Sequence, residues 1–296
     1  MTFIRELQDA VARTAAEVGP SVVGLGRGRG GSGIVVAEDR VLTSAHNIRG
    51  EEATVSFLDG RSERGPLLAA DVDRGLAVLE VPTGGAPALS WAGSEASIGT
   101  PVFALANPGG RGLRVTFGLV SATERSFRGA RGRRVRPSLE HTAPLVRGSA
   151  GGPLVDAAGG LLGINALRVE GSLVLALTAD ADLRSRVDAL ARGEAPQRMR
   201  LGVAIVPGRA ARRMRRAVGL PERDGLLVRQ VAADGPAADA GLEEGDLIAT
   251  ADGQALVEVD DLFRVLDAAE PGRSLALTVV RGLDERTVSL VLADAG

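Results

Sequence analysis

The chain has 296 residues, a formal net charge of −2, 45% hydrophobic residues and no cysteine. This length accommodates two ordinary domains, and the apolar fraction is typical of a globular rather than a disordered protein. The nearly balanced charge argues against a general nucleic-acid binder, and no apolar run is long enough to cross a membrane. The lack of cysteine excludes disulfides and thiolate metal sites.

The N-terminal segment is predicted to form a short amphipathic helix. Apolar residues recur on one face at helical spacing, at Ile4, Leu7, Val11, Ala15 and Val18. Three charged residues within the first nine positions interrupt the apolar stretch, which is unlike a secretory signal peptide. We therefore expect a cytoplasmic location if this N-terminus is native, and a periplasmic or other extracytoplasmic one if a leader was removed.

Short apolar runs then follow one another, separated by Gly, Pro, Asp and Ser. Examples are "GSGIVVA", "RVLTSA", "LAVLEV", "PVFALA" and "LLGINAL". These spacings predict the short strands of an all-β barrel or sandwich. From Asp180 the pattern becomes helical, with Leu183, Val187 and Leu190 on one face, and Gly193 is expected to end that helix. The first domain is therefore predicted over residues 1–193.

A polar linker over residues 194–199 precedes a second domain, predicted over 200–296. Its strands are expected in "LGVAIV", "GLLVRQV" and "GDLIATADGQAL", the last with a tight turn at Asp252–Gly253. A helical or irregular insert is expected at "ARRMRRAVGL", a short helix at "GPAADAGL" and a helix at "VDDLFRVLDAAEPG". "LALTVVRGLDERTVSLVL" is predicted to be a hairpin. These elements indicate a compact α+β module.

Three motifs of the first half occur in the order of a known catalytic framework. They are "RVLTSAHNIRG" with His46, "DVDRGLAVLEV", and "GSAGGPLVDAAGGLLGIN". Together they resemble the His, Asp and Ser segments of chymotrypsin-fold proteases, and their wording resembles the HtrA (Deg) family. In that family a PDZ domain follows the protease domain, and "RLGVAI" and "VAADGPAADAGLEEGDLIATADGQAL" resemble PDZ motifs. The resemblance implies a mainly β protein, a chymotrypsin-like double β-barrel followed by a small α+β PDZ domain.

The same resemblance assigns the catalytic positions, and two of them lack the required side chain. The histidine is His46, but the nucleophilic serine falls on Ala150 and the aspartate on Gly75. Losing the serine costs about 10⁶-fold in turnover and losing the aspartate about 10⁴-fold. The amides of Gly148 and Ala150 are retained as a candidate oxyanion hole. These assignments predict an inactive homologue, a pseudoprotease, of a serine protease.

Two neighbouring residues are candidates for the missing roles, and a designed replacement is an alternative origin of Ala150. Ser149 lies one residue early, where its side chain is expected to point elsewhere. Asp73 would share a face with Gly75 in extended backbone, which makes it a candidate substitute for the aspartate. An active HtrA-type serine endopeptidase carrying a designed Ser-to-Ala replacement is the alternative reading, and a purely structural scaffold is a third. Phe3 is the only aromatic residue near the N-terminus, so the trimers common in this family are in doubt and the oligomeric state stays open.

The second domain is expected to bind peptides. The resemblance assigns a carboxylate-binding loop and its pairing strand to Arg200, Leu201, Gly202 and Val203, with the helix near Val259 as one wall of the groove. Leu262, Phe263 and Leu266 are candidate lining or core residues. The partners expected are unfolded proteins or peptides, with C-terminal tails at the PDZ domain. No cofactor, metal, nucleic acid or membrane span is expected.

Two basic runs and a second histidine are interpreted as structural features. "RSFRGARGRRVR", which begins at Arg125, is interpreted as a solvated loop, with an acidic partner as the alternative. "ARRMRRAVG" is interpreted as a solvated helix. His141 is expected to be structural.

Overall fold

The computed structural model describes residues 2–26, 30–92, 95–129, 132–168, 173–196, 199–270 and 272–294. The chain divides into two compact units, Met1–Pro196 and Gln197–Gly296, each with its own apolar core. Within the described residues, no helix has the length and apolar character needed to cross a bilayer.

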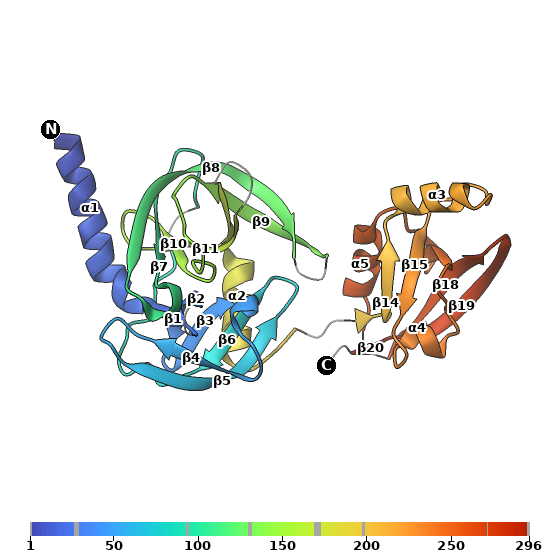
Figure 1. The fold of residues 1–296 in the computed structure, drawn as a ribbon, viewed down its shortest axis with the longest axis horizontal. Helices are drawn as coiled ribbons and strands as arrows, with labels where there is room; N and C mark the ends of the chain where they lie inside the picture. The colour runs from blue at the N-terminus through green and yellow to red at the C-terminus, as the bar shows by residue number, and fades with distance from the viewer. Residues whose placement is uncertain are drawn as a thin grey trace. The chain divides into compact units, whose positions relative to one another are not determined.

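Unit 1 contains two closed six-stranded barrels (Figure 1). The first, in the order β1-β2-β3-β6-β5-β4, consists of β1 (Val22–Leu25), β2 (Gly31–Ala37), β3 (Arg40–Ser44), β4 (Glu52–Ser56), β5 (Ser62–Asp71) and β6 (Leu76–Glu80). The second, in the order β10-β11-β12-β9-β8-β7, consists of β7 (Pro101–Ala106), β8 (Arg114–Arg128), β9 (Arg134–His141), β10 (Pro153–Val155), β11 (Leu161–Arg168) and β12 (Val174–Thr178). Neighbouring strands pair antiparallel. The predicted chymotrypsin-like double barrel is confirmed.

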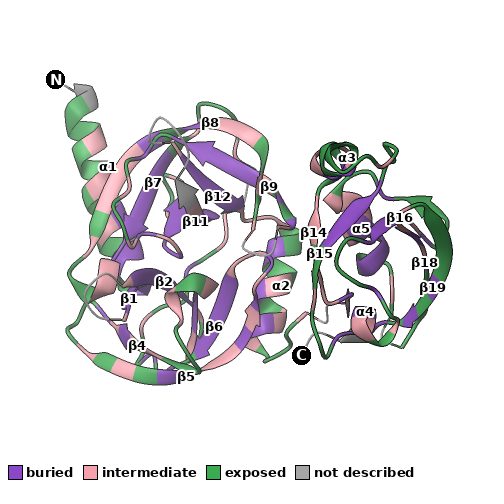
Figure 2. Cartoon of the chain, turned by 45° about the vertical axis from the view of Figure 1, so that its right-hand side comes forward, coloured by how far each residue is buried: buried purple, intermediate pink, exposed green. Residues whose placement is uncertain are grey.

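One apolar core extends through both barrels. It joins Ile34 and Leu42 of the first barrel to Phe103 and Ile164 of the second, and all four side chains are buried. Figure 2 shows the buried residues concentrated on the strands that face this interior. Burying one such side chain contributes about 1.5–3 kcal/mol, so the shared core holds the barrels in a fixed relation. Loops that leave the two barrels on the same side are therefore held together.

The first and last elements of unit 1 in the sequence are helices. The predicted N-terminal helix is confirmed as α1 (Thr2–Val18), which leads into a 3-10 turn, η1 (Gly19–Ser21). Leu7 and Val11 pack against the core, whereas Ile4 is 71% exposed. The predicted second helix is confirmed as α2 (Ala181–Ala191), and Asp180 caps it by accepting a hydrogen bond from the Leu183 amide.

The basic segment that begins at Arg125 is largely a β-hairpin, so its interpretation as a solvated loop was wrong. β8 continues to Arg128, β9 begins at Arg134, and these two residues are paired in the ladder. A strand alternates its faces, so exposed arginines can stand beside Val135, which is buried in the core. High charge density therefore did not prevent strand formation.

Unit 2 is a small α+β domain. Its six-stranded sheet runs in the order β14-β15-β16-β18-β19, with β17 paired to β16, and β13 pairs separately with β20. The elements are β13 (Met199–Arg200), β14 (Val203–Val206), α3 (Gly208–Ala217), β15 (Leu226–Val231), α4 (Pro236–Asp239), β16 (Leu247–Ala251), β17 (Gln254–Ala255), α5 (Val259–Asp267), β18 (Ser274–Arg281), β19 (Asp284–Val291) and β20 (Ala293–Asp294). The predicted strands, helices and hairpin are confirmed, including the turn at Asp252–Gly253, where both residues have positive φ.

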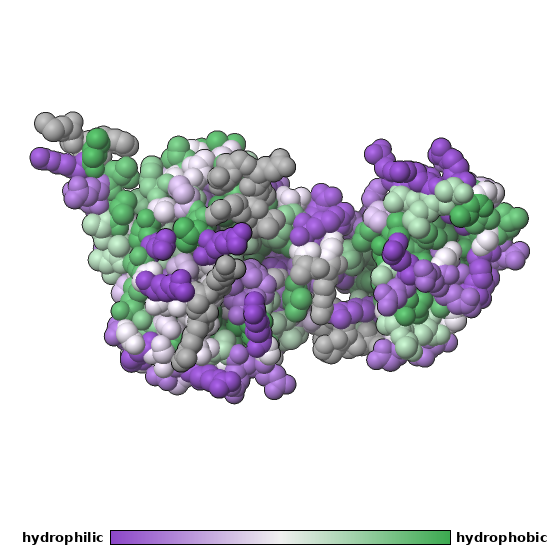
Figure 3. Space-filling view, in the orientation of Figure 1, coloured by the Kyte–Doolittle hydropathy of each residue, from purple (hydrophilic) through white to green (hydrophobic). Residues whose placement is uncertain are grey.

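The second basic run forms helix α3. Figure 3 shows hydrophilic side chains gathered over this helix. One of its arginines is not solvated: Arg215 is 3% exposed and donates hydrogen bonds to the backbone carbonyls of Pro221 and Gly282, each 3.1 Å away. The helix is thus confirmed, and Arg215 fixes it to the loop that follows it and to the β18–β19 turn.

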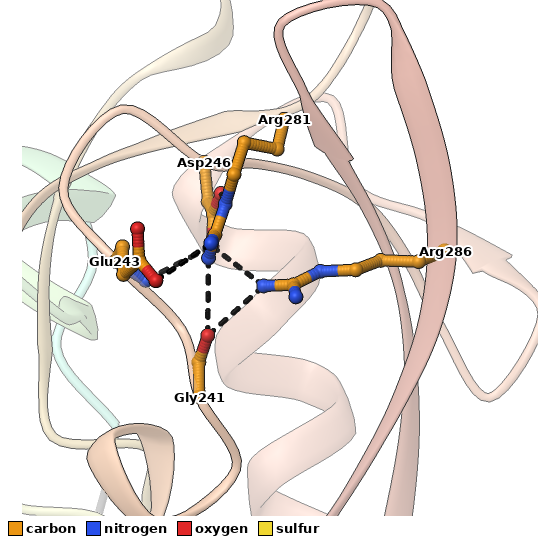
Figure 4. Close-up of polar contacts among 5 residues, drawn as sticks. All are labelled: Gly241, Glu243, Asp246, Arg281 and Arg286. Carbon is orange, nitrogen blue, oxygen red and sulfur yellow. Dashed lines mark hydrogen bonds and ion pairs between the residues drawn. The ribbon is translucent and has the colours of Figure 1, made fainter.

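A buried carboxylate joins the loop before β16 to the β18–β19 hairpin (Figure 4). The Asp246 side chain is fully buried, and its oxygens accept hydrogen bonds from Arg281 Nε at 2.7 Å and from the Glu243 amide at 2.9 Å. Arg281 also donates to the Gly241 carbonyl, and Arg286 donates both to that carbonyl and to Asp246. This network ties together segments that are distant in the sequence.

Candidate functional site

His46 lies where the first barrel ends a strand. The buried strand β3 stops at Ser44, and a 3-10 turn, η2 (Ala45–Asn47), places the imidazole of His46 at the surface, where it is only partly exposed. The Nδ1 atom of His46 lies 2.8 Å from the Ser44 Oγ atom. Partial burial lowers the pKa of His46 below its ordinary value, so the ring is neutral at pH 7.

Gly75, at the aspartate position, contacts this turn through its backbone. Its carbonyl accepts hydrogen bonds from the Ala45 amide at 2.8 Å and from Ser44 Oγ at 3.1 Å. Gly75 has a φ of +72°, which side chains other than Asn and Asp seldom adopt. A Cβ atom built there would meet nothing within 4 Å. The position therefore has room for a larger side chain, and the cost of placing one there is backbone strain.

The carboxylates that precede Gly75 pair with arginines. Residues 72–75 form a turn, in which Asp71 accepts a hydrogen bond from the Arg74 amide, so the assumption of extended backbone at Asp73 was wrong. Asp73 is 5% exposed, and its carboxylate lies 3.0 Å from the Nε atom of Arg133. The hydrogen-bonding partner of His46 Nδ1 is Ser44. Asp73 as a substitute aspartate remains a prediction without support from this geometry.

The glycine-rich loop between β9 and β10 is held against the first barrel. Asn47, the residue after His46, donates from Nδ2 to the Ala150 carbonyl at 3.0 Å. Ser32 donates its amide to the same carbonyl at 3.2 Å and its hydroxyl to the Gly148 carbonyl at 2.8 Å. These bonds bring the histidine turn and the nucleophile-position loop together, as expected for a site formed between two barrels.

Two glycines of this loop make the close approach feasible. Gly148 and Gly151 have φ values of +85° and +86°, and a Cβ atom on either would lie 2.3 Å from a backbone oxygen of the first barrel. Within the described part of the chain, the amides of Gly148 and Ala150 donate no hydrogen bond. Both donors are thus unused by the described protein, and their role as an oxyanion hole remains a prediction.

Ser149 is not placed as an activated nucleophile. It is 2% exposed, and its hydroxyl is buried without a hydrogen-bond partner among the described residues. A serine hydroxyl needs an adjacent base to become nucleophilic. Among the described residues, no such base is hydrogen-bonded to Ser149.

A pocket of about 350 Å³ opens beside the loop. Its walls are mainly apolar or backbone, and they are formed by Leu145, Val146, Arg147, Gly148, Ser149, Ala150, Asn165, Ala166 and Val174. Under the loop, the buried His141 lies with its Nε2 atom 2.9 Å from Asn165 Oδ1, and burial lowers its pKa to about 4. His141 is therefore neutral at pH 7. It positions Asn165, whose backbone carbonyl accepts a hydrogen bond from the Gly151 amide at 2.8 Å.

Sequence reasoning missed Ser44, Asn47 and Asn165. Asn47 could have been noticed as a polar side chain beside His46. Ser44 lies two residues before His46, but nothing in the sequence indicates that its hydroxyl reaches the imidazole. Among the described residues, no group of three His, Asp or Glu side chains is arranged to hold a metal ion.

The second candidate site lies in unit 2. β14 is an edge strand, because within the described sheet it pairs only with β15. Gly202, just before it, has a φ of +78°. The Leu201 side chain is buried in the core, and Arg200 belongs to β13. In α5, Leu262 and Leu266 are core residues and Phe263 is half-buried.

Known families account for both units. The trypsin-like peptidase domain matches residues 31–164, and the PDZ domain matches residues 200–292. A probable periplasmic serine endoprotease, DegP-like, from Halomonas elongata is 32% identical over 271 residues, which cover 89% of this chain and 56% of that protein. The chain belongs to the HtrA family.

Other relatives and solved structures support this assignment. A DegP-like probable periplasmic serine endoprotease of Brucella suis is 31% identical over 89% of this chain and 52% of its own length. The chain therefore spans about half the length of these curated relatives. The serine endoprotease from Yersinia pestis matches with a TM-score of 0.69 and 25% identity, over 97% of this chain and 98% of that one. The HtrA-type protease AlgW with a tripeptide matches with a TM-score of 0.64 and 27% identity, over 97% of each chain.

Proposed function

We propose that this chain is a peptide-binding HtrA homologue that does not cleave peptide bonds. The observation that carries the proposal is Ala150, a methyl side chain at the nucleophile position of a loop that is hydrogen-bonded to the His46 turn. A methyl group cannot form the acyl-enzyme on which serine proteases depend. Removal of that nucleophile alone costs about 10⁶-fold, or about 8 kcal/mol of activation free energy.

The second altered position makes the active-enzyme alternative less attractive. A designed Ser-to-Ala replacement would account for Ala150, but it would leave Gly75 unexplained. Gly75 has the left-handed backbone that favours glycine, and its carbonyl is integrated into the histidine turn. A site with two altered positions is better explained as one that no longer cleaves.

Peptide binding is the activity that the remaining geometry favours. The apolar pocket beside Ala150 suits one side chain of an extended peptide, and the amides of Gly148 and Ala150 suit its carbonyl oxygen. The solved structure of AlgW with a tripeptide supports peptides as the ligand class. We propose unfolded proteins and peptides as the partners of unit 1.

The first test is a turnover assay of the native chain. We expect no hydrolysis of casein or of a peptide ester above the rate without protein, because position 150 has no nucleophilic atom. Peptide binding to the same sample, measured by fluorescence anisotropy, should be retained. Hydrolysis that persists after repurification and co-elutes with the chain would contradict the proposal.

Unit 2 is proposed to bind free C-terminal tails that end in an apolar residue. The edge strand β14 offers unpaired backbone groups for β-augmentation, and Gly202 allows the preceding amides to turn toward a carboxylate. We expect a Kd on the order of micromolar. The matched control is the same peptide with a C-terminal amide, which should bind much more weakly in a titration of the labelled peptides. Equal affinity for both would show that this domain does not recognise the carboxylate.

A further inference from the structure

The Ser44 hydroxyl bridges the histidine and the residue at the aspartate position. Its Oγ atom lies 2.8 Å from His46 Nδ1 and donates to the Gly75 carbonyl at 3.1 Å. Ser44 is 6% exposed, so water is largely excluded from these contacts. The arrangement is rigid, because Ser44 is paired with Leu76 in the β3–β6 ladder and the Ala45 amide holds the same Gly75 carbonyl.

Counting protons fixes the direction of both hydrogen bonds. A serine hydroxyl has one proton, and a backbone carbonyl can only accept. The Ser44 hydroxyl therefore donates its proton to the Gly75 carbonyl. The Ser44 Oγ atom must then accept a hydrogen bond from the Nδ1–H group of His46. The opposite arrangement would place two oxygen atoms 3.1 Å apart with no proton between them. Only the Nδ1–H tautomer of His46 satisfies both contacts.

We infer that Ser44 is the positioning residue of this site, fixing the orientation and tautomer of His46 in place of the missing aspartate. In serine proteases the aspartate holds the histidine with Nδ1 protonated, so that Nε2 faces the nucleophile position as a base. Here a chain of two neutral groups, Ser44 and the Gly75 carbonyl, achieves the same tautomer. The inference rests on the proposed function, because it takes His46 as the base that this site retains.

The difference from an aspartate is the absence of charge. A carboxylate both orients the imidazole and stabilises the imidazolium that forms during catalysis. A serine hydroxyl orients it but offers no negative charge. Partial burial of His46 already lowers its pKa, and Ser44 does not counteract that effect electrostatically. The site therefore presents a neutral imidazole with an exposed acceptor atom, Nε2.

Nitrogen NMR of the native chain, labelled with ¹⁵N-histidine and recorded at pH 8, tests the inference without any turnover. We expect His46 to be protonated at Nδ1 and to show an unprotonated Nε2. The other histidine of the chain, His141, is an internal control with the opposite tautomer, because its Nε2 donates to Asn165 Oδ1. In Ser44→Ala, His46 should shift toward a mixture of tautomers, while His141 stays unchanged. A native His46 protonated at Nε2, or one that Ser44→Ala does not alter, would overturn the inference.

Kinetics in an Ala150→Ser background give a second readout. Adding Ser44→Ala is expected to lower kcat by about tenfold, the value of one hydrogen bond, with KM unchanged. Ser44→Thr keeps the hydroxyl on a strand residue and should restore the rate. If residue 44 were needed only for packing, the rate would not depend on whether its side chain carries a hydroxyl. An Ala150→Ser chain without any turnover would contradict the premise that His46 still acts as a base, and the native spectrum would still decide whether Ser44 fixes its tautomer.

Discussion

Replacing Ala150 by serine is expected to raise the rate of peptide-ester hydrolysis by about 10²-fold over the native chain. In serine proteases, loss of the nucleophile costs about 2 × 10⁶-fold and loss of the aspartate about 3 × 10⁴-fold, and the losses are far from additive. A serine returned to a site without aspartate should therefore recover only the ratio of these two factors, about 10²-fold. Steady-state kinetics on an activated ester measure the gain. An Ala150→Ser variant that folds but is no faster than the native chain would contradict the account of this site.

Adding Gly75→Asp to Ala150→Ser should raise the rate further, by up to about 10⁴-fold. Position 75 has space for the side chain, and aspartate is among the residues that tolerate its positive φ. The new carboxylate would compete with Ser44 for His46 Nδ1 and raise the pKa of the imidazole, because a nearby negative charge favours the imidazolium. Gly75→Asn is the matched control, with the same shape and no charge. Equal rates for the Asp and Asn variants would show that the carboxylate does not reach the histidine.

The second large effect is expected on stability. Asp246→Ala should lower the free energy of unfolding of unit 2 by about 2–3 kcal/mol, because it removes charge-assisted hydrogen bonds to a buried carboxylate. Glu243→Gln is the matched control, since Glu243 pairs with the same Arg281 but its side chain is 64% exposed. We expect the control to change stability by less than about 0.5 kcal/mol. Urea unfolding of both variants decides the comparison, and equal losses would show that the buried network is not the source of stability.

The same carboxylate makes the stability of unit 2 dependent on pH. Burial alone would raise the pKa of Asp246, but hydrogen bonds from Arg281 and the Glu243 amide hold it below its ordinary value of 3.8. A lowered folded-state pKa gives stability that is present above that ordinary value and is lost as the pH falls through the folded-state pKa. Native unit 2 should therefore lose stability below about pH 3.8, and Asp246→Ala should remove this part of the pH dependence.

Much of the fold was predictable because local patterns and tertiary structure agree. The apolar runs became barrel strands, and the helix with Leu183, Val187 and Leu190 on one face became α2 with those residues buried. Strand β5, "SERGPLLAAD", was missed because its charged residues and proline obscure the alternation. The Arg125 segment was misread because charge suggested a loop, although its strands expose one face.

The chemistry of the site was only partly predictable. Motif order predicted positions 46, 75 and 150 as the catalytic positions, but the contacts around them depend on backbone geometry that the sequence does not display. The turn at 72–75 directs Asp73 to Arg133, a partner sixty residues away in the chain. The role of Ser44 follows from the position of the Gly75 carbonyl, which depends on that same turn.

Reaction with a labelled fluorophosphonate, followed by intact mass spectrometry and peptide mapping, tests the central claim most directly. Such reagents attach to a serine only when a neighbouring base activates it. The native chain should gain no mass, because position 150 is alanine and the buried Ser149 hydroxyl has no hydrogen-bonded base in the described part of the chain. Ala150→Ser should gain one label, at residue 150. A label on the native chain at Ser149 would contradict the claim that this HtrA homologue has lost its nucleophile.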